Sequence, residues 1–278
     1  MCQEIINEKK GITIYGVQAM HVSEVTFIGD GIKAGFPSPA TDYLQEGINM
    51  NRVIVQKPDN TFIIIAEKGI SNEECIEEGN LLVIEQSLTP RENDLLAYIK
   101  DGEFLIGRIG EEDKNDLILL GVLIANIKIY KEHFHHGIES LPILPEEYPS
   151  LPSFVRRQVV GKIDLNTILL KNYATTFVTV ANGDSMIEDG IDDGNLLIID
   201  KSIAPYDQCL AACYINGEFT LKRVKVDNGC AWLLPSNPAY PEIKLSEDDD
   251  FLVWGIVVSN IKQFRYGRIT SGRSGRLQ

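Results

Sequence analysis

Short apolar runs rich in β-branched residues recur along the chain and are separated by turn residues. They cover residues 61–66, 81–84, 119–124, 196–199 and 253–258. An apolar run of roughly four to eight residues between turn signals is typical of a β-strand, and no long stretch keeps the apolar period of an amphipathic helix. The pattern therefore predicts a mainly β fold of short strands that curl into compact sheets.

Two dipeptides predict tight β-hairpins. Asp101-Gly102 and Asn216-Gly217 each interrupt a strand-like stretch. Both central residues of a type I′ turn need positive φ, which Gly, Asn and Asp adopt more readily than other residues. A hairpin is expected around each dipeptide.

The chain contains an internal repeat. Residues 48–109 align without a gap on residues 163–224, so each residue has a counterpart 115 positions later. Matching segments include 61–62 and 176–177 (TF), 79–82 and 194–197 (GNLL), and 102–104 and 217–219 (GEF). Later, GVLIANIK at 121–128 resembles GIVVSNIK at 255–262, now 134 positions apart, so the second copy carries 19 extra residues. One β-rich module is therefore predicted twice in tandem.

Composition narrows the class of protein. The 278 residues are enough for two domains, and the formal net charge of −14 disfavours direct contact with nucleic-acid phosphates. The five cysteines are scattered without a Cys-x-x-Cys pair, which favours a reducing compartment. No leader and no membrane-spanning apolar run is recognised. We expect a cytoplasmic protein whose role at DNA, if it has one, is exerted through another protein.

Two segments carry little functional signal. The stretch 132–151 contains His133, His135 and His136 followed by three prolines, and it is interpreted as a linker. A metal site at these histidines is the weaker interpretation, because they have no nearby cysteine partner. The Gly-, Ser- and Arg-rich end of the chain, within 265–278, is predicted to be a disordered tail. No metal and no cofactor are predicted.

Candidate chemistry lies where the two copies differ. Ser185 in the second copy aligns with Ile70 in the first, and Lys222 aligns with Gly107. A serine hydroxyl becomes a good nucleophile when a neighbouring base takes its proton, and an uncharged lysine can act as that base. Lys222 ends an alternating run and can point inward, where desolvation lowers the pKa of its amine.

The residues beside Ser185 are expected to have supporting roles. Gly183 would let backbone N–H groups approach a developing oxyanion, and Asp184 would order or cap the turn. The alternative is that Gly183, Asp184 and Ser185 form an ordinary polar turn and that Lys222 is an exposed strand residue. The presence of both Ser185 and Lys222 in only one copy favours the catalytic interpretation.

Four motifs together resemble the self-cleaving serine peptidases of the LexA/UmuD type, especially the UmuD-like members. They are AGFPSPATDY at 34–43, GDSM at 183–186, GEFTLK at 217–222 and PSNPAY at 235–240. The resemblance implies a β-rich peptidase fold in which Ser185 is the nucleophile and Lys222 the general base. It also implies a cleavage site between Ala34 and Gly35, in an extended arm that docks by strand addition.

The resemblance also implies a domain organisation. Residues 1–34 form an arm removed by self-cleavage, 35–131 a degenerate non-catalytic domain, 132–151 a linker, 152–264 the catalytic domain and 265–278 a tail. UmuD-like proteins carry one copy per chain and form homodimers, so the two copies here are expected to pack as an intramolecular pseudo-dimer, with a further homodimer left open. The first copy keeps the cleavage site and the second keeps the dyad.

In this family, cleavage is promoted by RecA filaments on single-stranded DNA, and the product joins a UmuC-like subunit of an error-prone translesion DNA polymerase. The resemblance thus implies a role in SOS mutagenesis. One alternative is a non-proteolytic scaffold that binds the polymerase or the filament. A LexA-like repressor is a further alternative, although only 34 residues precede the predicted cut, too few for a helix-turn-helix domain. A signal peptidase would use the same dyad but needs a membrane anchor.

Overall fold

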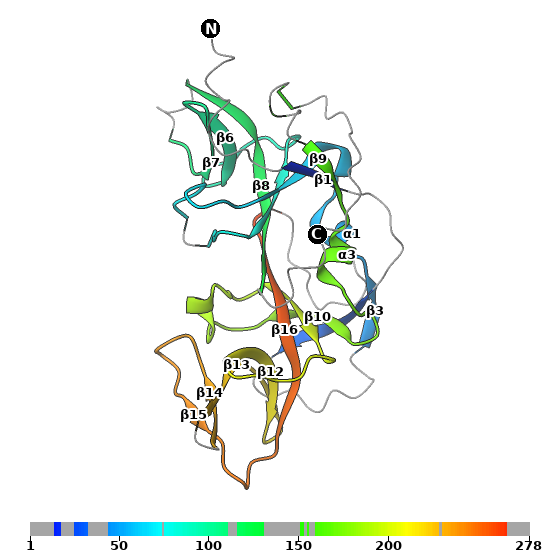
Figure 1. The fold of residues 1–278 in the computed structure, drawn as a ribbon, viewed down its shortest axis with the longest axis vertical. Coiled ribbons are helices and arrows are strands. Elements are labelled where there is room, and N and C mark those ends of the chain that lie inside the picture. Colours follow the sequence, from blue (N-terminus) through cyan, green and yellow to red (C-terminus); the bar gives the residue numbers. More distant parts are fainter. Residues whose placement is uncertain are drawn as a thin grey trace.

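The computed structural model describes residues 14–17, 25–32, 44–73, 75–110, 116–130, 151–152, 155, 159–227 and 230–265. The described chain is mainly β, as predicted, and its strands join into one sheet that runs through both copies (Figure 1). Figure 1 shows the copies one above the other, with β6 and β7 towards one end and β12 to β15 towards the other.

The first copy contains β3 (Leu44–Ile48), α1 (Met50–Ile54), η3 (Pro58–Asn60), β4 (Thr61–Ile65), β5 (Leu81–Glu85), β6 (Leu96–Lys100), β7 (Glu103–Gly107) and β8 (Leu117–Ile129). The second contains β9 (Val159–Ile163), α3 (Leu165–Leu169), β10 (Thr176–Ala181), η6 (Ile187–Asp189), β11 (Leu196–Asp200), β12 (Cys209–Ile215), β13 (Glu218–Asp227), β14 (Cys230–Leu234), β15 (Ile243–Lys244) and β16 (Phe251–Gln263). Two further strands, β1 (Ile14–Val17) and β2 (Val25–Ile32), come from the predicted arm.

The repeat is visible in the strand pairing. β4, β5 and β8 pair in that order in the first copy, as β10, β11 and β16 do in the second, and each copy adds a hairpin, β6–β7 or β12–β13. Both predicted hairpin dipeptides have positive φ, at 53° and 77° for Asp101-Gly102 and 49° and 96° for Asn216-Gly217. The extra residues of the second copy form β14, β15 and the loop between them.

Individual polar contacts are also repeated. Lys128 pairs with Glu77 in the first copy, and its counterpart Lys262 pairs with Asp192 in the second. The amide of Asn126 donates to the carbonyl of Cys75, and that of its counterpart Asn260 donates to the carbonyl of Gly190. Both copies thus retain the same framework of side-chain contacts.

The two copies pack as the predicted pseudo-dimer. β8 and β16 pair antiparallel across the boundary between the copies, and α1 packs beside α3. Asn51 donates to Asp164 Oδ1 and accepts from the backbone N–H of Leu165, at 2.7 Å and 3.0 Å. In return, Asn166 donates to Asn49 Oδ1 and accepts from the N–H of Met50, at 3.2 Å and 2.8 Å. Such reciprocal contacts are the mark of a two-fold interface.

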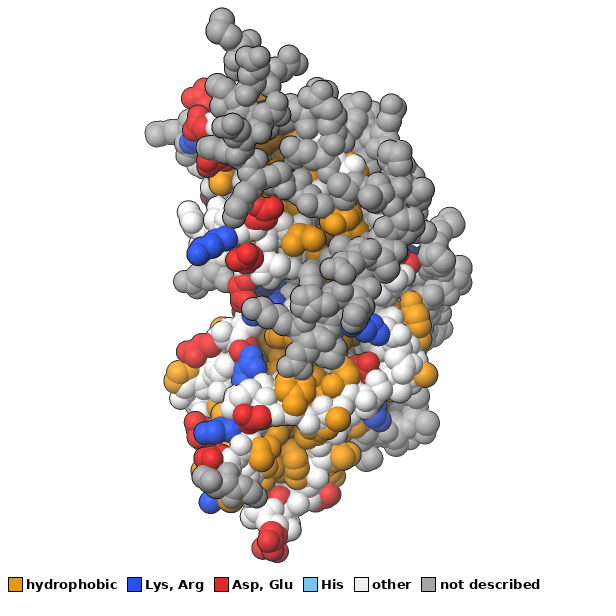
Figure 2. Space-filling view, in the orientation of Figure 1, with side chains coloured by type: hydrophobic (Ala, Val, Ile, Leu, Met, Phe, Trp, Pro, Cys, Tyr) orange, Lys and Arg blue, Asp and Glu red, His pale blue; other side chains and the backbone are white. Residues whose placement is uncertain are grey.

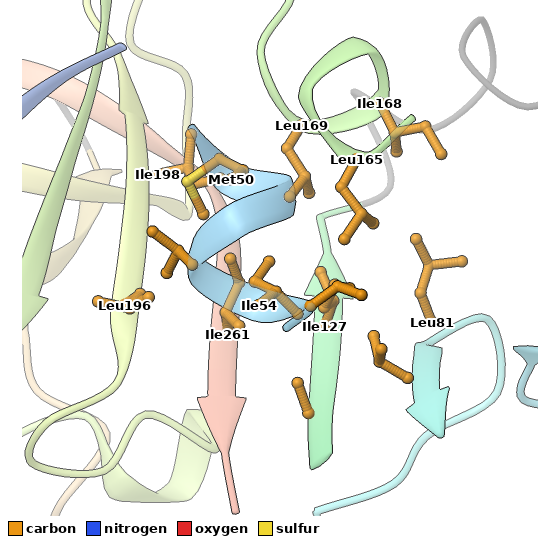
Figure 3. Packing of buried hydrophobic residues seen from close by; sticks show 14 of the residues in the cluster. Met50, Ile54, Leu81, Ile127, Leu165, Ile168, Leu169, Leu196, Ile198 and Ile261 are labelled. Carbon is orange, nitrogen blue, oxygen red and sulfur yellow. The ribbon is translucent and has the colours of Figure 1, made fainter. Parts of the chain in front are cut away.

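An apolar core lies at this boundary and includes residues from both copies. Met50 and Ile54 of α1, Leu165 and Leu169 of α3, and Ile261 of β16 belong to one buried cluster (Figure 3). Helices α1 and α3 have five residues each, four of them buried, so their stability depends on this tertiary packing.

The arm strands lie between the copies. β1 pairs antiparallel with β4 of the first copy and parallel with β9 of the second. β2 pairs parallel with β10 of the second copy and antiparallel with β3 of the first. In the repeat, β3 corresponds to β9 and β4 corresponds to β10. β1 and β2 therefore occupy equivalent positions between the copies. Their directions differ, because β1 is antiparallel to β4 whereas β2 is parallel to β10.

Several predicted features lie outside the described residues, among them Ala34, Gly35, the three linker histidines and the tail beyond Arg265. Arg265 itself, assigned to the tail from sequence, is a buried side chain that donates to Asp94 and to the carbonyl of Thr89 in the first copy. In the part of the chain that is described, no helix is long and apolar enough to cross a membrane, and no three His, Cys, Asp or Glu side chains are grouped to hold a metal ion.

The surface agrees with the acidic composition. On the face shown in Figure 2, acidic side chains are scattered over both copies, with single Lys and Arg side chains between them. The described residues of this face form no basic stripe of the kind that follows a phosphate backbone.

Candidate active site

Ser185 and Lys222 are brought together from separate elements of the second copy. Ser185 lies in the turn between β10 and η6, and Lys222 lies on β13 opposite Ala211 of β12. Lys222 Nζ is 3.0 Å from Ser185 Oγ. The hairpin at Asn216-Gly217 sets this geometry, because it turns β13 back along β12 and fixes which residues face the serine turn.

Lys222 is enclosed by the protein. The residue is only 5% exposed. Burial lowers the pKa of its amine below 10.5, and a smaller electrostatic effect of Cys213 raises this pKa. Burial disfavours the charged amine because the low-dielectric surroundings solvate it poorly. Lys222 is thus shifted toward the form that can accept a proton.

The three contacts of the amine suit that role. Besides Ser185, Nζ lies 2.9 Å from Thr220 Oγ1 and 2.9 Å from the carbonyl oxygen of Leu221. A neutral amine has two N–H donors and one lone pair. When it donates to Thr220 and Leu221, its lone pair is directed to the hydroxyl of Ser185, which then donates its proton.

Gly183 shapes the turn in a way that the sequence did not predict. Its φ of +85° is in the left-handed region that favours glycine. Its backbone N–H donates to Asp193 Oδ1 at 3.0 Å. Gly183 therefore contributes backbone conformation in this structure, and its N–H is engaged elsewhere.

Asp184 orders the turn together with the loop between β14 and β15. Its carboxylate accepts from the hydroxyl of Tyr240 at 2.5 Å, and its carbonyl accepts from the side-chain amide of Asn237 at 3.0 Å. The N–H of Ser236 donates to the carbonyl of Ser185 at 3.0 Å, and the carbonyl of Ser236 accepts from the N–H of Glu188 at 2.9 Å. The loop between β14 and β15 thus bonds to the serine turn both at Asp184 and Ser185 and at Glu188, which follows them.

A cleft of about 370 Å³ opens at the dyad. Ser185, Lys222, Thr220 and Glu218 provide polar groups along it. Apolar side chains line the remainder, namely Ile191, Leu197, Ile215, Leu221, Pro241 and Ile243. Such a cleft suits an extended peptide with small or apolar side chains near the reacting bond.

The arm leads toward this cleft. In the parallel pair of β2 and β10, Ile32 lies opposite Ala181, the last residue of β10. Ala34 follows Ile32 by two positions, and Ser185 follows Ala181 by four. The described chain therefore brings the arm alongside the strand that carries the serine turn, in the direction of the predicted cleavage site.

The equivalent place in the first copy is filled. Ile70, the counterpart of Ser185, is buried in the apolar core of that copy together with Ile106. The carbonyl of Ile70 accepts from the N–H of Ile106 at 2.8 Å. This hydrogen bond joins the turn that contains Ile70, which corresponds to the serine turn of the second copy, directly to β7. The first copy also has no counterpart of β14 and β15 among its described residues, so both the dyad and one wall of the cleft are specific to the second copy.

Sequence comparison of the copies identified the dyad but not its supports. Thr220 lies in the GEFTLK motif, and its position two residues before Lys222, on the same face of a strand, was the available signal. Tyr240 and Ser236 were also within a motif, but their contacts with a turn some 50 residues earlier had no local signal.

Known proteins resemble both copies of the chain. The sequence pattern of the family described as Peptidase S24-like matches residues 26–130 and again 150–258. Protein SamA of Salmonella typhimurium is 34% identical over 125 residues, which cover 45% of this chain and 86% of SamA. Protein ImpA of Escherichia coli is 35% identical over 80 residues, 29% of this chain and 55% of ImpA. A LexA repressor of Oleidesulfovibrio alaskensis is 29% identical over 122 residues, 44% of this chain and 58% of the repressor.

Proposed function

Because the chain belongs to the Peptidase S24-like family, we propose that it is a self-cleaving serine peptidase that cuts its own Ala34–Gly35 bond. Ser185 is the nucleophile and Lys222 the general base. The observation that carries the proposal is the 3.0 Å approach of a buried lysine amine to a serine hydroxyl inside a peptide-sized cleft.

The reaction follows from the contacts of Lys222. The neutral amine takes the proton of Ser185 Oγ as the oxygen attacks the carbonyl carbon of Ala34. The resulting ammonium gives this proton to the nitrogen of Gly35 as the peptide bond breaks, which leaves Ala34 esterified to Ser185. Lys222 then takes a proton from water, the hydroxide attacks the ester, and the proton returns to Ser185 Oγ. The products are a carboxylate at Ala34 and a new N-terminus at Gly35.

The position of β2 supports the choice of bond. Its pairing with β10 carries the chain to Ala181, next to the serine turn, and a small residue followed by glycine comes two positions later. Glycine after the bond lets the backbone lie close to the nucleophile. Since β2 and the dyad belong to one chain, the C-terminal copy cleaves the arm of the same molecule.

The biological role that we propose is in SOS mutagenesis. SamA, ImpA and the LexA repressor are relatives of the chain, and the resemblance to UmuD-like proteins implies that the cleaved product is an accessory factor for error-prone translesion synthesis. The proposed partners are a RecA filament on single-stranded DNA, which promotes cleavage, and a UmuC-like polymerase subunit, which binds the product. The net charge of −14 favours a route through protein partners over direct DNA binding.

The test is intact-mass analysis of the purified protein and of Ser185→Ala, held at neutral and alkaline pH with and without RecA filaments. A product beginning at Gly35, formed by the wild type and not by the variant, is the expected result. An uncut wild-type protein under all four conditions would refute self-cleavage and favour a scaffold that binds the polymerase or the filament. A cut that persists in Ser185→Ala would refute the assigned nucleophile.

A further inference from the structure

β1, in the arm that the sequence predicts to be removed, has the surroundings of a central strand. One edge pairs with β4 from Ile14 opposite Ile64 to Gly16 opposite Phe62. The other edge pairs with β9, up to Val17 opposite Ile163. Both of its hydrogen-bonding edges are therefore used, one by each copy of the module.

Both faces of β1 are covered as well. Ile14 is 0% exposed and packs in the core of the first copy with Phe62 and Ile64. Val17 is 2% exposed and packs in the cluster at the boundary between the copies, against which Tyr15 also lies. Burial raises the pKa of the Tyr15 hydroxyl. Successive side chains of a strand point to opposite faces, so β1 joins two cores that belong to different copies.

Loss of β1 would uncover strands that are otherwise internal. Phe62, Ile63 and Ile64 of β4 are all 0% exposed, and β4 would become an open sheet edge. An exposed, apolar edge strand is a site of aggregation. β2 fills the equivalent position between β10 and β3, so both joints between the copies contain a strand of the same arm.

We propose that the arm is a permanent structural part of both copies and remains bound after the chain is cut near residue 34. Cleavage then yields a nicked two-piece complex with new chain ends beside the active cleft, and the body is not freed of its arm. The proposal takes the position of the cut from the proposed function. The retention of the arm is tested without relying on self-cleavage.

The experiment uses full-length Ser185→Ala with a recognition sequence for a site-specific endopeptidase inserted between Ala34 and Gly35. After complete cutting, the N-terminal fragment is expected to elute with the body on native size exclusion and to separate from it only in denaturant. A body that elutes without the fragment would overturn the proposal. Because the added endopeptidase makes the cut, an inactive dyad does not affect the result.

Two variants of the same protein identify the strand responsible. Val17→Asp places a charge in the buried cluster and is expected to release the fragment on cutting, whereas Leu252→Asp, at a residue 56% exposed, is expected to retain it. Retention by Val17→Asp would refute the assigned role of β1.

If Val17→Asp does not fold, hydrogen exchange on uncut Ser185→Ala tests the same role of β1 without a substitution in that strand. The amides of residues 15–17 are expected to exchange as slowly as those of β4. Exchange at the rate of a free peptide would contradict the proposal.

Discussion

The amine of Lys222 is held where a positive charge is poorly solvated, and this affects stability as well as reactivity. Its folded-state pKa is lowered by burial, so between that value and 10.5 the unfolded chain binds more protons than the folded one. Stability therefore rises as pH increases through this window, and below it the folded state carries the full cost of the buried charge. The proposed role of Lys222 as a base thus comes at the expense of stability.

We expect Lys222→Met to raise the melting temperature at neutral pH, because it removes a buried amine that is costly to protonate. The gain should shrink as pH rises through the folded-state pKa toward 10.5, because above 10.5 the wild-type amine is mostly neutral in both states. Thermal denaturation across this range, in a Ser185→Ala background that prevents cutting, is the measurement. Lys171→Met, at an exposed position, is the control and should show no such trend. A lower melting temperature for Lys222→Met at neutral pH would contradict the cost assigned to this amine.

In the proposed mechanism, the same pKa governs the rate of cleavage. Since only the neutral amine can take the serine proton, the rate should rise about tenfold per pH unit and level off above the pKa of Lys222, at a midpoint below 10.5. Single-turnover cleavage followed by intact mass gives this profile. Lys222→Arg, which stays charged, should lose at least about 1000-fold in rate at every pH. A wild-type rate that is flat from neutral to alkaline pH would exclude Lys222 as the base.

The two candidate catalytic residues could be found from the sequence because the chain contains a repeat. Ser185 and Lys222 stand out because a second copy of the same module supplies a built-in comparison, with Ile70 and Gly107 in their places. The hydrogen bond from the N–H of Gly183 to Asp193 was not predicted, since Asp193 lies beyond η6 and no spacing rule connects the two residues.

Among the elements, the loop between β14 and β15 distinguishes the copy that carries Ser185 and Lys222 from the other copy. It belongs to the 19 residues that only the second copy has, and it contacts the serine turn through Ser236, Asn237 and Tyr240. The hydrogen bond from Tyr240 to Asp184 lies at the surface, because Tyr240 is 41% exposed. Its main effect should therefore be on the geometry of the turn and not on global stability.

Tyr240→Phe is expected to slow cleavage by up to about tenfold and to leave the melting temperature within about 1 °C of the wild type. The loss of a hydrogen bond to a carboxylate loosens the turn without opening the core. Cleavage rate and thermal denaturation are measured on the same preparation, with Tyr173→Phe, another exposed tyrosine, as the matched control. Equal cleavage rates for the wild type and Tyr240→Phe would show that this contact does not position the turn.

The strands of each copy were predictable because their apolar runs and hairpin dipeptides are local signals. Helices α1 and α3 were not predicted, because five residues are too few to establish a helical period. The arm was expected to dock by strand addition, but the positions of β1 and β2 were not predicted. Each pairs with strands of both copies, and such pairing depends on contacts far apart in the sequence. The predicted arm is therefore more extensively built into the sheet than its sequence indicated.

For the whole molecule, the reciprocal contacts of Asn51 and Asn166 imply a symmetric effect on stability. Each is buried and bonds to the opposite copy, so Asn51→Ala and Asn166→Ala should each cost about 1–3 kcal/mol through partners left unsatisfied. Urea denaturation measures both, with the exposed Asn72→Ala as the matched control that should change little. If only one of the two buried variants were destabilised, the packing at the boundary would not be two-fold.

The presence of two copies and one Ser185–Lys222 pair in a single chain has a kinetic consequence for the proposed reaction. Two copies in one chain supply one active cleft and one arm, and the pairing of β2 with β10 holds that arm beside the cleft of its own chain. The effective concentration of the cleavage site at the dyad is then set by the fold and not by the amount of protein in solution.

Cleavage should accordingly be first order, with one rate constant over a hundredfold dilution of the protein. A mass-labelled Ser185→Ala chain mixed with unlabelled wild type should remain uncut while the wild type is consumed, because its arm is held beside its own inactive cleft. Intact mass distinguishes the two chains in a single sample. Cutting of the labelled chain at the wild-type rate, or a rate that falls with dilution, would mean that arms pass between molecules and that the pseudo-dimer does not confine the reaction to one chain.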